Sequence, residues 1–149
     1  MKRAFSLIEI LIVVAILGIL AAIVMPEYLS HSQKAKEVTA KDNLRMLKDA
    51  IERYAVQHNG LSPGYRQENP SNPAGGIGIL EGHLSPYLLK LPENPFNKLS
   101  VVKIIQNWED FPAEPVEIDA VGWVYKPATK NVRLNWAGTD SEGLAYFDY

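Results

Sequence analysis

One carboxylate lies inside the most apolar part of the sequence. Glu9 is the only ionisable residue between Phe5 and Met25. On membrane-insertion scales an acidic side chain at this depth costs about 2.5–3.5 kcal/mol, so an intramembrane acid indicates a functional residue that needs a cation. The first chemistry that the sequence predicts is therefore the pairing of Glu9 with a positive charge.

No catalytic motif is found in the rest of the sequence. Cysteine is absent, which excludes disulfides, cysteine-ligated zinc, iron–sulfur clusters and thiol catalysis. The histidines His31, His58 and His83 have no metal-ligand spacing, and we expect them at the surface. No serine lies in a nucleophile elbow, and there is no glycine-rich phosphate loop. We therefore predict that the protein is not an enzyme and needs no cofactor.

The composition limits the size and the partners of the protein. Its 149 residues fit one domain of ordinary size. The 15 basic and 17 acidic residues give a net charge of −2, which leaves no excess of positive charge to bind phosphates. We therefore expect no nucleic-acid partner.

The element that must position Glu9 is the apolar segment 5–25. As a helix with a rise of 1.5 Å per residue it is about 30 Å long, which is the thickness of the hydrocarbon core of a bilayer. Lys2 and Arg3 precede it. The positive-inside rule then predicts a single membrane pass with the N-terminus in the cytoplasm and the bulk of the chain on the other side.

Two other interpretations of this segment are weaker. A core helix this apolar on all sides would need a larger protein to enclose it. A secretory signal peptide cut near Ala21 and Ala22 fits the basic start and the apolar stretch, but such a signal has no use for Glu9. A retained anchor is the interpretation that gives Glu9 a role.

The residues around Glu9 also carry a family resemblance. The run AFSLIEILIVVAILGILA from Ala4 to Ala21, followed by Pro26 and Tyr28, closely resembles the N-terminus of type IV pilins and type II secretion pseudopilins. The match is long and specific.

The resemblance implies processing of the N-terminus. A leader of residues 1–4 would be removed by a prepilin peptidase between Ala4 and Phe5, and the same enzyme would N-methylate Phe5. The family usually has glycine before the cut, whereas this chain has Ala4. Alanine is the smallest substitute, and we expect processing to proceed.

Processing would also supply the cation that Glu9 needs. The new amine of Phe5 lies one helical turn from Glu9, and two charges in a low-dielectric environment are costly unless they are neutralised. The pair could form within one helix or between subunits. The resemblance implies the second arrangement, in which Glu9 of an incoming subunit meets the amine of its neighbour and fixes the axial register.

The helix is predicted to continue over residues 26–59. Pro26 removes a backbone donor and Gly18 is a second weak point, so we expect a kink, and the resemblance implies that helical hydrogen bonds between the two are lost in a filament. Asn59 and Gly60 predict the end of the helix. An apolar stripe at helical period predicts packing on a sheet; its members are Ala40, Leu44, Leu47, Ile51, Tyr54 and Ala55.

Residues 60–149 are predicted to form a globular head. Glycine, proline and asparagine predict a loop over 60–82, followed by a short helical or extended piece around 83–91. Strands are predicted at 100–106, 121–125 and 132–136. The fold class is therefore α+β and pilin-like, with a long N-terminal helix packed on a small antiparallel sheet. The corner Leu91–Phe96 resembles the proline-rich corner that precedes the sheet in major pseudopilins.

Asp140 and Glu142 are the candidates for a metal site. They lie in an acidic turn, residues 138–143, and oxygen ligands at alternate positions suit calcium. Some major pseudopilins bind calcium at this location. Two carboxylates are few for such a site, and a solvated turn is the favoured interpretation.

The resemblance implies a structural subunit of a type IV pilus-like filament, most specifically a pseudopilin of a type II protein secretion system. Its expected location is the bacterial inner membrane, with the head in the periplasm, and then a periplasmic or extracellular filament. The expected partners are copies of itself, prepilin peptidase, assembly platform proteins and membrane lipid. The alternatives are an adhesive or competence pilus subunit and a membrane-anchored periplasmic binding module.

Overall fold

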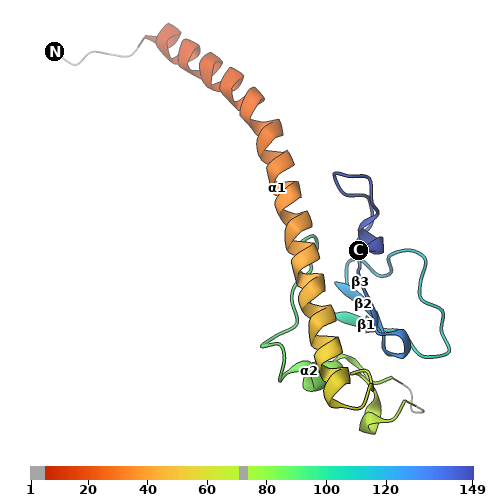
Figure 1. Ribbon diagram of the computed structural model, residues 1–149. Coiled ribbons are helices and arrows are strands. Elements are labelled where there is room, and N and C mark those ends of the chain that lie inside the picture. Colours follow the sequence, from red (N-terminus) through yellow and green to blue (C-terminus); the bar gives the residue numbers. More distant parts are fainter. Residues whose placement is uncertain (1–5, 71–73) are drawn as a thin grey trace. The chain divides into compact units, whose positions relative to one another are not determined.

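The chain forms two compact units, Met1–Ala35 and Lys36–Tyr149. The computed structural model describes residues 6–70 and 74–149. Helix α1 (Leu7–Gln57) begins in the first unit and ends in the second. Among the described residues, every other helix and strand belongs to the second unit (Figure 1).

The part of α1 in the second unit carries the predicted apolar stripe. Its members are at most 4% exposed: Ala40, Leu44, Leu47, Ile51, Tyr54 and Ala55. Leu47 and Ile51 share a core cluster with Trp123 and Tyr125 of the sheet. The prediction that this stripe packs on a sheet is confirmed, and apolar burial at helical period is what makes this half of α1 stable.

Helix α1 ends where the sequence predicts. Asn59 and Gly60 have left-handed backbone conformations, with φ of 54° and 86°. The N–H of Gly60 donates to the carbonyl of Ala55 at 2.7 Å. This bond between residues five positions apart is the 6→1 hydrogen bond of a Schellman motif. Glycine adopts this conformation without a steric penalty, so the dipeptide stops the helix.

A second helix, α2 (Ile77–Leu84), lies partly in the segment predicted as a loop. The predicted loop 60–82 is therefore wrong over its last residues. Gly76 is the N-cap of α2, and its carbonyl accepts the N–H of Ile79 at 3.0 Å. Leu80 and Leu84 are buried, and their spacing of four residues is the helical pattern that the glycines concealed.

The sheet contains three strands in the order β1-β2-β3, which lie side by side in Figure 1. They are β1 (Val102–Ile104), β2 (Trp123–Lys126) and β3 (Asn131–Leu134). Strands β2 and β3 are antiparallel, as predicted, whereas β1 is parallel to β2. The predicted all-antiparallel sheet is therefore wrong for β1. The long connection 105–122 returns the chain to the end of the sheet at which β1 began, as a parallel pair requires.

Successive residues of the strands point to opposite faces of the sheet. Trp123, Tyr125 and Leu134 belong to the core cluster that contains the α1 stripe. Val124 packs in a second cluster with Phe147, on the other face. Both faces of β2 are thus covered, and its first three residues are buried.

The corner Leu91–Phe96 is held by a buried polar core. Asn94 is fully buried, and its Nδ2 donates to the carbonyls of Gly122 at 3.0 Å and Asn135 at 3.3 Å. The indole of Trp123 donates to the carbonyl of Pro92 at 2.8 Å. Because each buried polar group has a partner, these bonds fix the corner against β2 and β3.

Candidate functional site

The described residues of the predicted membrane segment are not buried by other residues of their own unit. Every residue from Ser6 to Met25 is exposed. By length and composition α1 contains a stretch that could cross a membrane. A continuous apolar surface of this size indicates a site of contact with lipid or with other apolar surfaces.

Glu9 caps the N-terminus of α1. Ser6 precedes the first helical residue, Leu7, and Glu9 is the third residue of the helix. The Oε2 atom of Glu9 accepts a hydrogen bond from the backbone N–H of Ser6 at 2.8 Å. This is one half of a capping box, which satisfies a backbone donor that the helix leaves unpaired. The observed partner of Glu9 is therefore its own helix terminus.

The functions predicted for the other residues of this segment stay predictions. Ala4 and Phe5 lie outside the described residues, so cleavage and methylation there stay predictions. Helix α1 is assigned without interruption through Gly18 and Pro26. The expected loss of helical hydrogen bonds between them concerns the filament, and it also stays a prediction.

Asp140, the first calcium candidate, is enclosed by hydrogen-bond donors. Its Oδ1 accepts the backbone N–H groups of Glu142 and Leu144, both at 2.9 Å. Its Oδ2 accepts the Tyr149 hydroxyl at 2.8 Å and the Lys41 ammonium at 3.2 Å. The side chain of Asp140 is only 1% exposed. The turn is thus not simply solvated, because its central carboxylate is buried and paired.

These contacts determine the charge of Asp140. Burial by itself would raise its pKa, but the hydrogen bonds from Tyr149, from the N–H groups of Leu144 and Glu142, and from Lys41 outweigh burial and lower the pKa to about 2. Burial and the hydrogen bond to Asp140 raise the pKa of the Tyr149 phenol. Asp140 is therefore an anion and Tyr149 a neutral donor at neutral pH.

The two calcium candidates, Asp140 and Glu142, have different surroundings. A carboxylate offers about four lone-pair positions, and four donors already occupy those of Asp140. Glu142 is exposed and contributes its backbone N–H to Asp140. Within residues 6–70 and 74–149 there is no group of three or more His, Cys, Asp or Glu side chains that could hold a metal ion.

A second buried carboxylate lies beside the same turn. Glu37 is 5% exposed, although it belongs to the more polar start of this part of α1. Its Oε1 accepts the Tyr146 hydroxyl at 2.9 Å, and its Oε2 accepts the Ser141 hydroxyl at 3.0 Å. Glu37 and Lys41 are not among the candidate residues that the sequence predicts. The signal was present, because Glu37 precedes Ala40 by three residues and so extends the apolar stripe at helical period.

Two of the three histidines are not the surface residues that we predicted. His31 is exposed, but His58 and His83 are half-buried. Both rings stack on Tyr54, with centroid distances of 3.8 Å for His58 and 4.9 Å for His83. The Nε2 atom of His58 lies 3.7 Å from Oε1 of Glu68, an ion pair when the imidazole is protonated.

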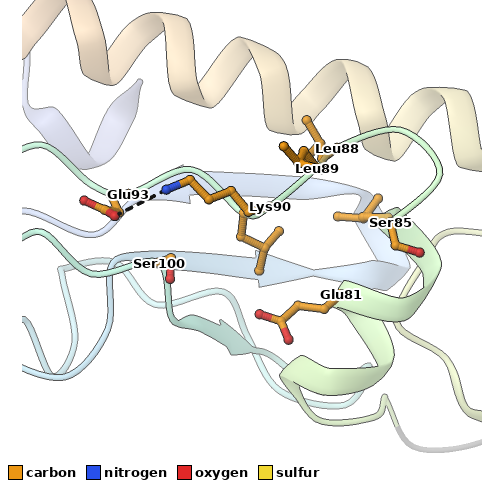
Figure 2. A pocket seen from close by; sticks show the side chains of 9 residues that line it. Glu81, Ser85, Leu88, Leu89, Lys90, Glu93 and Ser100 are labelled. Carbon is orange, nitrogen blue, oxygen red and sulfur yellow. Dashed lines mark ion pairs between the residues drawn. The ribbon is translucent and has the colours of Figure 1, made fainter.

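The groove drawn in Figure 2 has a volume of about 320 Å³ and lies beside the C-terminal end of α2. Leucines line it together with one ion pair, in which Lys90 Nζ and Glu93 Oε1 are 3.8 Å apart. The hydroxyl of Ser85 donates to the carbonyl of Gly82 at 2.9 Å. The lining contains no histidine that could activate a serine.

The architecture and the exposed apolar helix define a pilin-like protein. Its long helix is apolar at the N-terminal end, and further along it packs on a small mixed sheet in an α+β unit. The family model of the prokaryotic N-terminal methylation motif matches residues 1–25. These residues contain Glu9.

Curated relatives agree with this class. The chain is 36% identical over 98 residues to the type II secretion system core protein G of Pseudomonas aeruginosa, a match that covers 64% of this chain and 68% of that protein. With core protein G of Vibrio cholerae the identity is 33% over 101 residues, and the match covers 64% of this chain and 66% of the relative. With the type IV major pilin protein PilA of Myxococcus xanthus it is 40% over 74 residues, or 50% of this chain and 31% of the pilin.

The chain belongs to the family of type II secretion system core protein G. Its matches span about two thirds of the core protein G relatives and less than one third of the Myxococcus pilin. No solved structure matches the chain.

Proposed function

We propose that this protein is a structural subunit of a type II secretion filament, of the major pseudopilin kind. Its apolar segment 5–25 first anchors it in the inner membrane and then forms contacts with neighbouring helices in the filament. Membership of the core protein G family supports this role, as does the methylation motif over residues 1–25. The basic residues Lys2 and Arg3 support a cytoplasmic N-terminus and a periplasmic head.

The observation that carries the proposal is the position of Glu9. It is the only ionisable group in an apolar segment whose described residues are all exposed. A segment of this kind has two favourable environments, lipid and the corresponding segments of other subunits, because both remove apolar surface from water.

Glu9 would change its partner when the subunit is processed. In the unprocessed chain its carboxylate accepts the N–H of Ser6. Cleavage between Ala4 and Phe5 by prepilin peptidase would create an amine, which the peptidase would then methylate. The Glu9 of an incoming subunit would pair with that amine on a neighbour. Since a charge in low dielectric is costly without a counterion, a subunit in the wrong axial register would be disfavoured.

A set of three substitutions at Glu9 tests this role. Glu9→Gln keeps an oxygen that can accept the Ser6 N–H but removes the charge, Glu9→Asp keeps the charge on a shorter side chain, and Glu9→Ala removes both. We expect all three to be processed, as judged by intact mass. We expect Glu9→Gln and Glu9→Ala to lower the amount of sheared filament at least tenfold, which corresponds to about 1.4 kcal/mol. Filament at the normal level with Glu9→Gln would show that the charge is not needed.

The second candidate is a subunit of an adhesive or competence pilus. The match to the Myxococcus major pilin, at 40% identity over half of the chain, favours keeping it. The absence of cysteine argues against membership of the group of pilins whose C-terminal loop is closed by a disulfide. A deletion strain separates the two: loss of protein export supports the secretion filament, and loss of adhesion or DNA uptake with normal export supports the pilus.

A further inference from the structure

The C-terminal segment 138–149 is fastened to α1 by two side chains of the helix. Glu37 and Lys41 are four residues apart, so they project from the same face of α1. Glu37 binds the hydroxyls of Tyr146 and Ser141. Lys41 binds the carboxylate of Asp140 at 3.2 Å.

The two carboxylates of this cluster, Asp140 and Glu37, have one cation between them, and their other partners are hydrogen-bond donors. Asp140 is the anion of the turn, and the ammonium of Lys41 is the cation in contact with it. The Lys41 Nζ also lies 4.6 Å from the centre of the Tyr149 ring, a favourable cation–π contact. The second anion, Glu37, receives two hydroxyl donors. Hydrogen bonds to an ionised group are the stronger kind, so this network can hold a chain terminus.

The cluster leaves no place for a divalent cation. Calcium takes six to eight oxygen ligands at about 2.3–2.6 Å, and it would have to displace the four donors that surround Asp140. One of these donors is itself a cation, Lys41, which would repel calcium at close range.

We propose that Lys41 takes the place of a metal ion in this chain, so that the head is held together by a calcium-independent clasp of Glu37, Lys41, Asp140, Tyr146 and Tyr149. A lysine on the long helix then performs the task that a bound calcium ion would perform in an acidic C-terminal turn. The consequence is a head whose stability does not change between calcium-rich and calcium-poor surroundings, whichever filament the chain builds.

The first test is thermal melting of the full chain in detergent, in 1 mM calcium chloride and in excess chelator. The proposal predicts the same melting temperature in both, within about 1 °C. A rise of several degrees with calcium would overturn it. Calcium binding measured by titration calorimetry on the same sample provides an independent readout, and a stoichiometric site of micromolar affinity would also overturn the proposal.

The second test asks whether Lys41 is the cation of the clasp. Lys41→Met keeps the aliphatic stem and removes the charge, whereas Lys41→Arg keeps the charge. Lys48→Met, at an exposed lysine of the same helix, is the matched control. We expect Lys41→Met to lower the melting temperature by about 4 °C or more, and Lys41→Arg to retain most of the stability. Equal melting temperatures for Lys41→Met and Lys48→Met would overturn the role of Lys41.

Discussion

The Nδ1 atom of His83 accepts a hydrogen bond from the backbone N–H of Gly64 at 3.0 Å. This contact joins α2 to the loop that follows α1, and it requires a neutral imidazole with its proton on Nε2. Burial lowers the pKa of His83, the nearby Glu68 opposes this effect, and His58 adds to it. Folding therefore favours the neutral ring.

The pH dependence of stability follows from this contact. Because the pKa of His83 is lower in the folded state than its ordinary value of 6.5, its contribution to stability is complete above pH 6.5 and is lost as the pH falls below it. His83→Asn places an amide oxygen close to the position of Nδ1 and does not titrate. We expect the native chain to lose more stability than this variant between pH 7.5 and 5.5, measured by thermal melting in detergent.

Both chains keep His58, Glu68 and Tyr54, the other titratable groups of the cluster. The comparison therefore isolates His83 from the ion pair of His58 with Glu68, which protonation strengthens. Parallel pH profiles for the native chain and the variant would contradict the assigned tautomer and its role.

Gly122 is expected to tolerate no side chain. A Cβ atom there would lie 2.1 Å from the carbonyl oxygen of Leu99, and backbone on both sides of the contact leaves no flexible group to move. We expect Gly122→Ala to destabilise the head by about 3 kcal/mol or more, measured by denaturant unfolding. Gly78→Ala is the control, since nothing lies within 4 Å of the added Cβ and alanine favours a helix. Similar stability for the two variants would show that the corner can relax.

Asn94 is expected to be essential for the corner before the sheet. Replacing it by alanine would leave the N–H of Phe96 and the carbonyl of Asn135 without the bonds that the Asn94 side chain makes to them, whereas the carbonyl of Gly122 keeps its bond from the N–H of Asn135. Each such loss costs about 1–3 kcal/mol, so we expect Asn94→Ala to lower the unfolding free energy by at least about 2 kcal/mol. Asn43→Ala removes an exposed bond to the Glu93 carbonyl and should cost about 1 kcal/mol or less. A cost for Asn94→Ala no larger than for Asn43→Ala would refute this role.

Acid is expected to weaken the C-terminal clasp. The pKa of Asp140 is lowered in the folded state from 3.8 to about 2, so its stabilising contribution is present above pH 3.8 and disappears as the pH falls towards 2. Asp140→Asn should therefore melt below the native chain at pH 7, and the gap should narrow between pH 4 and 2. A gap that stays constant over this range would mean that the charge of Asp140 does not stabilise the fold.

The elements that depend on local pattern could be predicted from the sequence. Periodicity predicts the apolar stripe from Ala40 to Tyr54 and the positions of the three strands. Turn residues predict the helix end at Asn59 and Gly60. The direction of β1 could not be predicted, because alternation along a strand is the same for parallel and antiparallel partners. It is decided by the course of the connection 105–122, which has no periodic pattern.

The contacts that join distant parts of the chain could not be predicted from the sequence either. No sequence motif distinguishes Lys41 from the other charged residues of α1, and only the fold brings it to Asp140, 99 residues away. His83 lacked any motif, because its partner is a backbone N–H, which every residue except proline carries. The predicted partner of Glu9 is an amine that forms only when the chain is cleaved. Neither the sequence nor the fold of the unprocessed chain contains this amine.

Processing that leaves Phe5 as the N-terminus is the step by which we propose that this chain becomes a filament subunit. It is tested most directly by the intact mass and N-terminal sequence of the protein from membranes of cells with and without prepilin peptidase. We expect a chain that begins at N-methylated Phe5 only when the peptidase is present. A chain cut near Ala22, or one that keeps its original N-terminus in both strains, would contradict it.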